Sequence, residues 1–104
     1  MHGWTFLTNH GLVLSVLAKY PRITGRELST KVGITERATR KIIADLEAEG
    51  YISKKKEGRG IRYRINPDLP MRHETYEDIA IGDFLKALGK KKKQVRAKGS
   101  NYKS

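Results

Sequence analysis

Only three residues, Gly33, Ile34 and Thr35, separate two predicted helices, and so short a connection permits few arrangements of the chain. The first helix begins after Thr24, because Thr24 and Glu27 are spaced for a capping box in which each side chain accepts from the other's amide. Gly33 suits the left-handed residue that ends a helix, and Thr35 is the predicted N-cap of the next helix. Helices joined this closely cannot lie antiparallel and both pack on a third helix, so we expect them to cross at a wide angle.

The segments beside this pair supply the rest of a helical core. Residues Thr8–Tyr20 carry apolar side chains at helical spacing and precede a proline, which predicts a buried helix. The helix that follows the turn is predicted over Glu36–Glu49 and stops at Gly50. Its inward positions, at helical spacing, are Thr39, Ile43 and Leu46. The three helices together predict a helix-turn-helix core.

After Gly50 the hydrophobic period changes to two, which is typical of a half-buried strand. The alternating apolar residues of this strand are Ile61, Tyr63 and Ile65. Tyr51–Lys56 is the predicted partner strand, and Glu57–Gly60 is the predicted hairpin loop. A last helix is predicted over Tyr76–Leu88 with Ile79 on its apolar face. The fold class is therefore α+β, with a three-helix core, a β-hairpin and a C-terminal helix.

The basic residues gather in two zones of the sequence. The chain of 104 residues has 22 Lys and Arg against 11 Asp and Glu. Residues 19–64 hold 13 basic and 6 acidic side chains, residues 65–85 are acidic, and residues 86–104 hold 8 basic and no acidic ones. A basic folded segment with a basic tail is typical of a polyanion binder. We predict one domain over residues 1–88 and a disordered lysine-rich tail over residues 89–104, which contacts phosphate without reading bases.

The solvent face of the helix at 36–49 is predicted to be basic, with Arg37 and Lys41 opposite the core and Arg40 beside them. Arginine or lysine at this place can bond guanine O6 and N7 in the major groove, and the helix N-terminus favours phosphate. Arg59, at the tip of the following hairpin, can reach a minor groove or a phosphate. The candidate DNA-contacting residues are Thr35, Glu36, Arg37, Arg40, Lys41, Lys54, Lys55, Lys56, Arg59, Arg62 and Arg64.

The run from Leu12 to Ile65 resembles prokaryotic winged helix-turn-helix transcriptional regulators of the broad MarR/ArsR type, most clearly at residues 23–28, 32–37 and 46–52 and in the hairpin. Residues 4–10 and 68–73 are similar to a subgroup of small single-domain members. The resemblance implies a homodimer, a recognition helix at 36–49 and a wing at 53–64. The chain is short for the long dimerisation helices of typical MarR proteins and lacks the cysteines and clustered histidines of metal-sensing ArsR proteins. We therefore expect neither the ligand pocket of MarR proteins nor the metal site of ArsR proteins in this chain.

Five apolar residues near the two ends of the chain have two interpretations, ordinary core or a dimer seam. They are Trp4, Phe6, Phe84, Leu85 and Leu88. We expect Phe6 in the core, whereas Leu88 could face a partner. The three histidines, His2, His10 and His73, are scattered singly and are expected to be hydrogen-bonding or surface residues rather than metal ligands.

The predicted function is a sequence-specific regulator that binds double-stranded DNA in the cytoplasm, at the nucleoid. Two other classes stay open: an architectural or RNA-associated protein that coats nucleic acid, and a winged helix that binds a protein partner. We expect no enzyme, cofactor or membrane partner, because the sequence has no metal-binding motif, phosphate-cradling glycine loop or nucleophile with a histidine pattern, and no span or signal peptide. The chain has no cysteine, which excludes disulfides and thiolate sites. The sequence does not predict an effector ligand.

Overall fold

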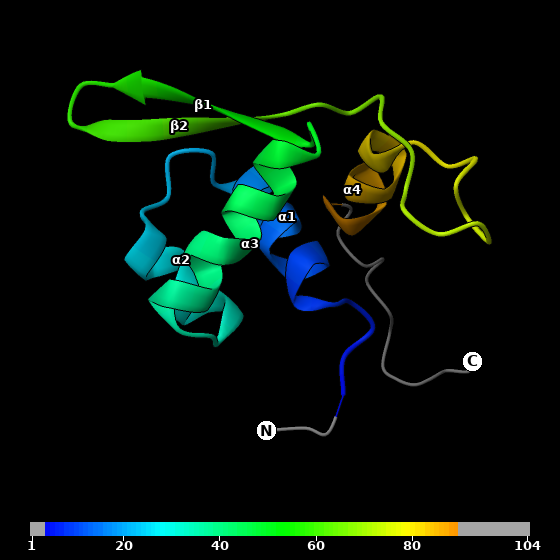
Figure 1. The fold of residues 1–104 in the computed structure, drawn as a ribbon, viewed down its shortest axis with the longest axis horizontal. Coiled ribbons are helices and arrows are strands. Elements are labelled where there is room, and N and C mark those ends of the chain that lie inside the picture. Colours follow the sequence, from blue (N-terminus) through cyan, green and yellow to red (C-terminus); the bar gives the residue numbers. More distant parts are fainter. Residues whose placement is uncertain (1–3, 90–104) are drawn as a thin grey trace, which may run out of the picture.

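The computed structural model describes residues 4–89, which form four helices and a two-stranded antiparallel sheet (Figure 1). The elements are α1 (Asn9–Lys19), α2 (Gly25–Val32), α3 (Glu36–Ala48), β1 (Ile52–Glu57), β2 (Gly60–Ile65) and α4 (Ile81–Gly89). The first three helices lie within a residue of their predicted bounds at each end. The lysine-rich tail, from residue 90 onward, lies outside the described residues, so the division of the chain at residue 88 stays a prediction. None of the helices in residues 4–89 has the length and apolar content needed to cross a bilayer.

The turn between α2 and α3 has the predicted caps. Thr24 Oγ1 accepts from the Glu27 amide at 3.1 Å, and Glu27 Oε1 accepts from the Thr24 amide at 3.1 Å. The Thr24 amide and, next, the Thr24 hydroxyl both donate to Glu27 Oε1, and these two hydrogen bonds lower the pKa of the Glu27 carboxyl. Gly33 has a left-handed backbone, with φ of +86°, and its amide donates to Ser29 O at 2.8 Å. Thr35 Oγ1 then accepts from the backbone amide of Ala38 at 3.0 Å, so α3 begins where the sequence predicts.

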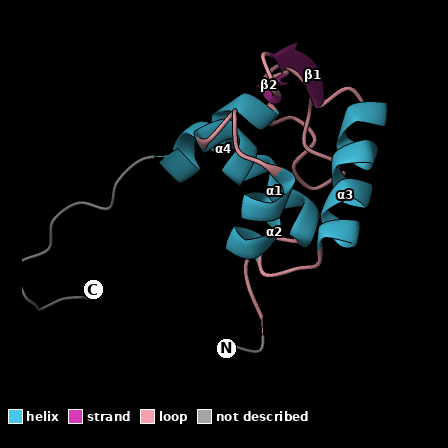
Figure 2. Ribbon diagram, turned by 90° about the vertical axis from the view of Figure 1, so that its left-hand side faces the viewer, coloured by secondary structure: helices cyan, strands magenta, loops and turns pink. Residues whose placement is uncertain are grey.

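Helix α1 is the centre of the core, because it contacts α2, α3, α4 and β2. Figure 2 shows α1 between α4 and α3. The largest fully buried side chains are Leu17, Leu28, Val13 and Thr39. The Thr39 hydroxyl donates to Thr35 O at 2.8 Å, so its burial leaves no unsatisfied donor. The apolar side chains of this core each contribute about 1.5–3 kcal/mol when fully buried.

The hairpin is hydrogen-bonded along β2 to the segment that precedes α2. Ile52 pairs with Ile65 at its base, and Glu57 pairs with Gly60 at its tip, which leaves a two-residue turn. The Tyr63 amide donates to Pro21 O at 2.7 Å, so the segment before α2 holds the outer edge of β2. In Figure 1 the hairpin extends past the helices on the side of α2 and α3.

One residue of β2 departs from the predicted burial. Tyr63 is buried and Ile65 half-buried, as the alternation predicts, but Ile61 is 42% exposed. The prediction for Ile61 was wrong because this residue lies toward the tip of the hairpin, beyond the helices that cover Tyr63. Alternation correctly assigns the strand, but it cannot show where the core ends along it.

The C-terminal helix predicted over residues 76–88 begins later, at Ile81. The preceding residues pair with the segment after β2: the Met71 amide donates to Ile79 O at 3.0 Å, and the Ile81 amide donates to Leu69 O at 2.7 Å. Because these groups bond across to another segment, they do not form helical turns. Ile79 is 43% exposed, so its predicted place on an apolar helix face is also wrong.

The aromatic residues before α1 are not in the core. Phe6 is 92% exposed and Trp4 is 71% exposed, and their rings meet edge to face with centroids 5.0 Å apart. The prediction of a buried Phe6 was therefore wrong, because no helix of residues 4–89 covers the segment that carries it. Phe84 and Leu85 pack against the core, and Leu88 is 41% exposed.

Candidate nucleic-acid interface

Helix α3 presents a cationic face to solvent. Its buried residues are Thr39, Ile42, Ile43 and Leu46, and they hold the helix against α1. The 3.6-residue period places Arg37, Arg40 and Lys41 on the exposed side, with the small side chain of Ala44 in the next turn. The structure thus brings three predicted cations together over the first two turns of one helix.

Glu36 lies between two arginines at the start of α3. Its carboxylate is 3.9 Å from Arg26 Nε of α2 and 4.0 Å from Arg40 Nη1 of the next turn. Arg37 has no carboxylate within salt-bridge distance among residues 4–89. Exposed ion pairs are worth about 0–1 kcal/mol, so exchanging them for a phosphate or a base edge costs little.

Lys41 forms an ion pair with Asp45, one turn later in α3. Its Nζ is 3.3 Å from Asp45 Oδ1, and His10 Nε2 of α1 is 2.8 Å from Asp45 Oδ2. The hydrogen bond from His10, followed by that from Lys41, lowers the pKa of the Asp45 carboxyl. His73 contacts Thr75 Oγ1 at 2.8 Å. Within residues 4–89 no three His, Asp or Glu side chains are grouped as a metal site requires, and His2 lies outside that range.

The hairpin, or wing, carries its cations on its outer face and at its tip. Lys55 pairs with Arg62 across the strands, and Arg64 follows Arg62 on the same face, opposite the buried Tyr63. Arg59 occupies the turn after Gly58, whose φ is +57°. All five of the following exposed cations lack a carboxylate within salt-bridge distance in the described part of the chain: Lys55, Lys56, Arg59, Arg62 and Arg64.

Lys54 stands apart from the other predicted site residues. It lies directly across from Tyr63, on the face of the hairpin that packs on the core, and its Nζ is 3.3 Å from Glu47 Oε1 of α3. Burial raises the pKa of the neighbouring Tyr63 hydroxyl. Lys54 therefore links β1 to α3 in this structure.

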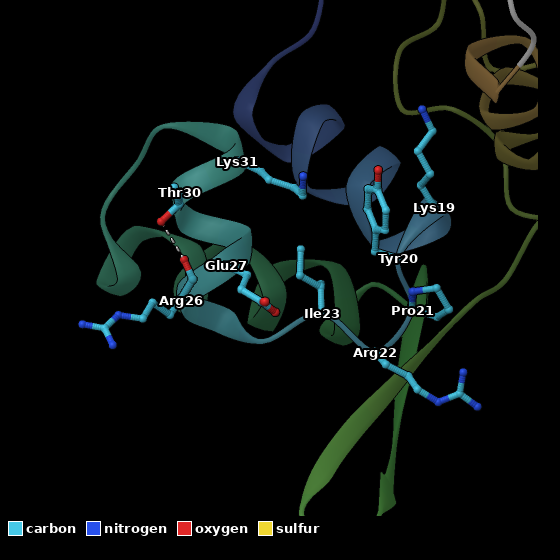
Figure 3. A pocket seen from close by; sticks show the side chains of 9 residues that line it. All are labelled: Lys19, Tyr20, Pro21, Arg22, Ile23, Arg26, Glu27, Thr30 and Lys31. Atoms are coloured by element: carbon cyan, nitrogen blue, oxygen red, sulfur yellow. Dashed lines mark hydrogen bonds between the residues drawn. The ribbon is translucent and has the colours of Figure 1, made fainter.

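Two arginines outside the predicted set of DNA-contacting residues join the elements of this interface. Arg22 Nε is 2.9 Å from Glu57 Oε1 at the end of β1, and Arg26 of α2 meets Glu36 of α3 as described above. Both arginines flank Thr24, so a search for cations beside a strong helix start would have found them. Figure 3 shows that they also border a hollow between the end of α1 and α2.

Comparisons with known proteins agree with this geometry. Residues 7–53 match the family model described as winged helix-turn-helix DNA-binding. A predicted DNA-binding transcriptional regulator from E. coli is similar in structure, with a TM-score of 0.53 and 23% identity over 75% of this chain and 70% of its own. IscR from T. potens has a TM-score of 0.55 and 15% identity over 83% of this chain and 89% of its own. The zinc-dependent MarR-family regulator AdcR, in its zinc-bound state, has a TM-score of 0.48 and 26% identity over 62% of this chain and 47% of its own.

None of the curated proteins matches the sequence. The family model and the first two solved structures show the fold, which is a winged helix-turn-helix with an added C-terminal helix. Helix α3 holds the position of the recognition helix in this fold, and the hairpin that follows it holds the position of the wing.

Proposed function

Because residues 7–53 match the winged helix-turn-helix DNA-binding family, we propose that this protein is a sequence-specific regulator of transcription that binds duplex DNA and catalyses no reaction. The observation that carries the proposal is the exposed cationic face of α3, together with the five wing cations, all but Lys54, that have no carboxylate within salt-bridge distance in residues 4–89. The similar E. coli structure is named as a predicted DNA-binding transcriptional regulator, which supports the assignment. Since its proposed ligand is chromosomal DNA, we place its action at the nucleoid in the cytoplasm.

The two parts of the interface have different tasks in this proposal. Arg37, Arg40 and Lys41 enter the major groove and contact base edges, while Thr35 and the amides at the start of α3 lie near a phosphate. Glu36 complements the helix dipole and orients Arg40. The wing residues Lys55, Lys56, Arg59, Arg62 and Arg64 contact the backbone or a minor groove. Lys54 holds the wing to α3 through Glu47.

The test is selection of bound duplexes from a randomised DNA pool by the full chain at near-physiological salt. Enrichment of a motif supports the proposal. If the folded protein enriches no motif, the sequence-specific claim fails. Equal affinity for unrelated duplexes, or a preference for RNA, would then favour a coating protein, and weak binding to all nucleic acids would favour a protein-interaction module.

Two substitutions separate base reading from backbone contact. Arg37→Ala should weaken binding to the selected site by about 1–3 kcal/mol and relax the preference at one base pair. Lys55→Ala should weaken binding to all sequences alike and reduce the slope of log K against log salt by about 0.9. Lys86→Ala, an exposed lysine on α4, is the control. Equal losses on selected and random DNA for Arg37→Ala would contradict the base-reading role.

We also propose that the protein acts as a homodimer. Trp4, Phe6 and Leu88 are exposed apolar side chains, and a hollow of about 470 Å³ between α1 and α4 is lined in part by Leu7 and Leu85. Leu88 lies with Leu7 and Leu85 at this hollow, and neighbouring exposed apolar side chains favour association. A dimer would bind a near-palindrome whose half-sites lie about one helical turn apart, or a multiple of that. Sedimentation of the full chain and of a Trp4→Ser, Phe6→Ser variant tests this, and a monomer at concentrations that saturate the selected duplex would overturn it.

A further inference from the structure

A hollow of about 660 Å³ lies between the end of α1, the segment that follows it and the exposed side of α2 (Figure 3). Its residues are Lys19, Tyr20, Pro21, Arg22, Ile23, Arg26, Glu27, Thr30 and Lys31. Ile23 is buried beneath it, and Tyr20 and Pro21 form an apolar wall where the chain leaves α1. The volume is within the range of about 300–1,000 Å³ that is usual for small-molecule sites.

The rim of this hollow has an excess of positive charge. Four of its residues are cations, and its one acid, Glu27, already accepts hydrogen bonds from Thr24. Arg22 and Arg26 share their charge with carboxylates outside the hollow. Lys19 and Lys31 have no carboxylate within salt-bridge distance in residues 4–89. An anion with more than one negative charge matches this rim better than a singly charged one.

The aromatic ring of Tyr20 stands between Lys19 and Lys31 (Figure 3). Lys31 Nζ lies 4.9 Å from the centroid of the Tyr20 ring, and the Tyr20 side chain is 45% exposed. The exposed ring and the neighbouring proline offer a surface on which a planar group can stack. Stacking of a base on an aromatic side chain is worth about 1–3 kcal/mol in nucleic-acid binding proteins. The hollow thus combines a surface for a planar ring with a site for a doubly charged group.

We propose that this hollow binds a nucleoside phosphate and that the bound nucleotide regulates DNA binding. The phosphate pairs with Lys31, while Lys19, on the other side of the Tyr20 ring, adds attraction at longer range, and the base packs against Tyr20, Pro21 and Ile23. A phosphate group carries about two negative charges near neutral pH, which suits the four cations of the rim. The regulatory part rests on the proposed DNA-binding function, whereas the binding site itself does not.

The residues of the hollow are joined to both parts of the DNA interface. Pro21 O accepts from the Tyr63 amide of the wing at 2.7 Å, and Arg22 pairs with Glu57 of the wing at 2.9 Å. Arg26 reaches Glu36, the first residue of α3, at 3.9 Å. A bound nucleotide adds negative charge near Arg22 and Arg26, weakens their attraction to Glu57 and Glu36, and so changes how the wing and α3 are held. Couplings between two sites of one protein are typically about 5–150-fold in affinity.

The first test is calorimetric titration of the full chain with ADP, adenosine and pyrophosphate at near-physiological salt. We expect saturable binding of ADP, with adenosine and pyrophosphate each at least about tenfold weaker because each lacks one half of the ligand. The Lys19→Gln, Lys31→Gln double variant should bind ADP at least about tenfold more weakly, and the control Lys86→Gln should bind it like the parent chain. Circular dichroism checks that both variants are folded. If pyrophosphate binds as tightly as ADP, the proposed site is wrong. It is also wrong if the double variant binds ADP as tightly as the parent chain does.

The second test measures affinity for a selected duplex by fluorescence anisotropy, with and without saturating ADP. We expect ADP to change the duplex affinity of the parent chain at least about fivefold and to have no such effect on the double variant. If ADP binds but the affinity for the duplex does not change, the proposal that the nucleotide regulates DNA binding is wrong. If the chain binds no duplex, the proposed DNA-binding function fails, while the calorimetric titration still decides the nucleotide site.

Discussion

Gly33→Ala is the substitution that best tests how the turn positions α3. Gly33 has φ of +86°, and a Cβ added there would meet no atom within 4 Å. The cost therefore comes from the left-handed backbone alone, about 1–2 kcal/mol for a residue with a side chain. A second glycine, Gly25 in the first turn of α2, also has open space around its Cβ position but an ordinary φ.

Comparison of the two variants isolates this strain. Either change from glycine to alanine restricts the unfolded chain by a similar amount, so this effect cancels in the difference between them. Gly25→Ala should be neutral or slightly stabilising, and Gly33→Ala should be about 1–2 kcal/mol less stable than Gly25→Ala, a difference in Tm of about 4–16 °C. Urea unfolding followed by circular dichroism measures both, and Gly33→Asn should recover part of the loss. Equal stability of Gly25→Ala and Gly33→Ala would refute the argument.

Three further substitutions test other parts of the fold. Gly82→Ala would place its Cβ 2.6 Å from Pro67 Cβ, so a loss of about 1–3 kcal/mol is expected in thermal unfolding; an unchanged Tm would mean that α4 is not held against this proline. Leu17→Ala, at a position with no exposed surface, should cost about 2–5 kcal/mol in urea unfolding, and a smaller loss would contradict its central place in the core. The pKa of Asp45 is lowered in the folded chain, so its contribution to stability is present above the ordinary aspartate pKa and is lost as pH falls through the folded value. Between about pH 6 and pH 2, the free energy of unfolding of the parent chain should fall toward that of Asp45→Asn. A difference in this free energy that stays constant with pH would show that the ionised Asp45 carboxylate, bonded to His10, does not stabilise the fold.

The sequence predicts well where neighbouring residues decide the structure. The Thr24 capping box, the left-handed Gly33 and the Thr35 cap each depend on residues within four positions of one another, so their signals are complete in a short segment. The exposure of Arg37 and Lys41 follows in the same way, because the period of a helix ties their direction to that of the buried residues three or four positions away.

The sequence does not predict features that depend on what covers a segment. Phe6 has the composition of a core residue, yet no element of residues 4–89 lies over it, and Ile61 extends beyond the helices that cover Tyr63. The start of α4 depends on backbone hydrogen bonds with residues near Leu69, a partner that helical periodicity cannot reveal.

By itself, then, the sequence determined the three-helix core, the hairpin and the cationic character of the surface around α3. Only the tertiary structure decided which cations are already paired. Lys54 meets Glu47, Arg22 meets Glu57 and Arg26 meets Glu36, each across two different elements. The physical reason is that capping and periodicity act over a few residues, whereas ion pairs and hollows depend on distances between segments that only the packed core sets.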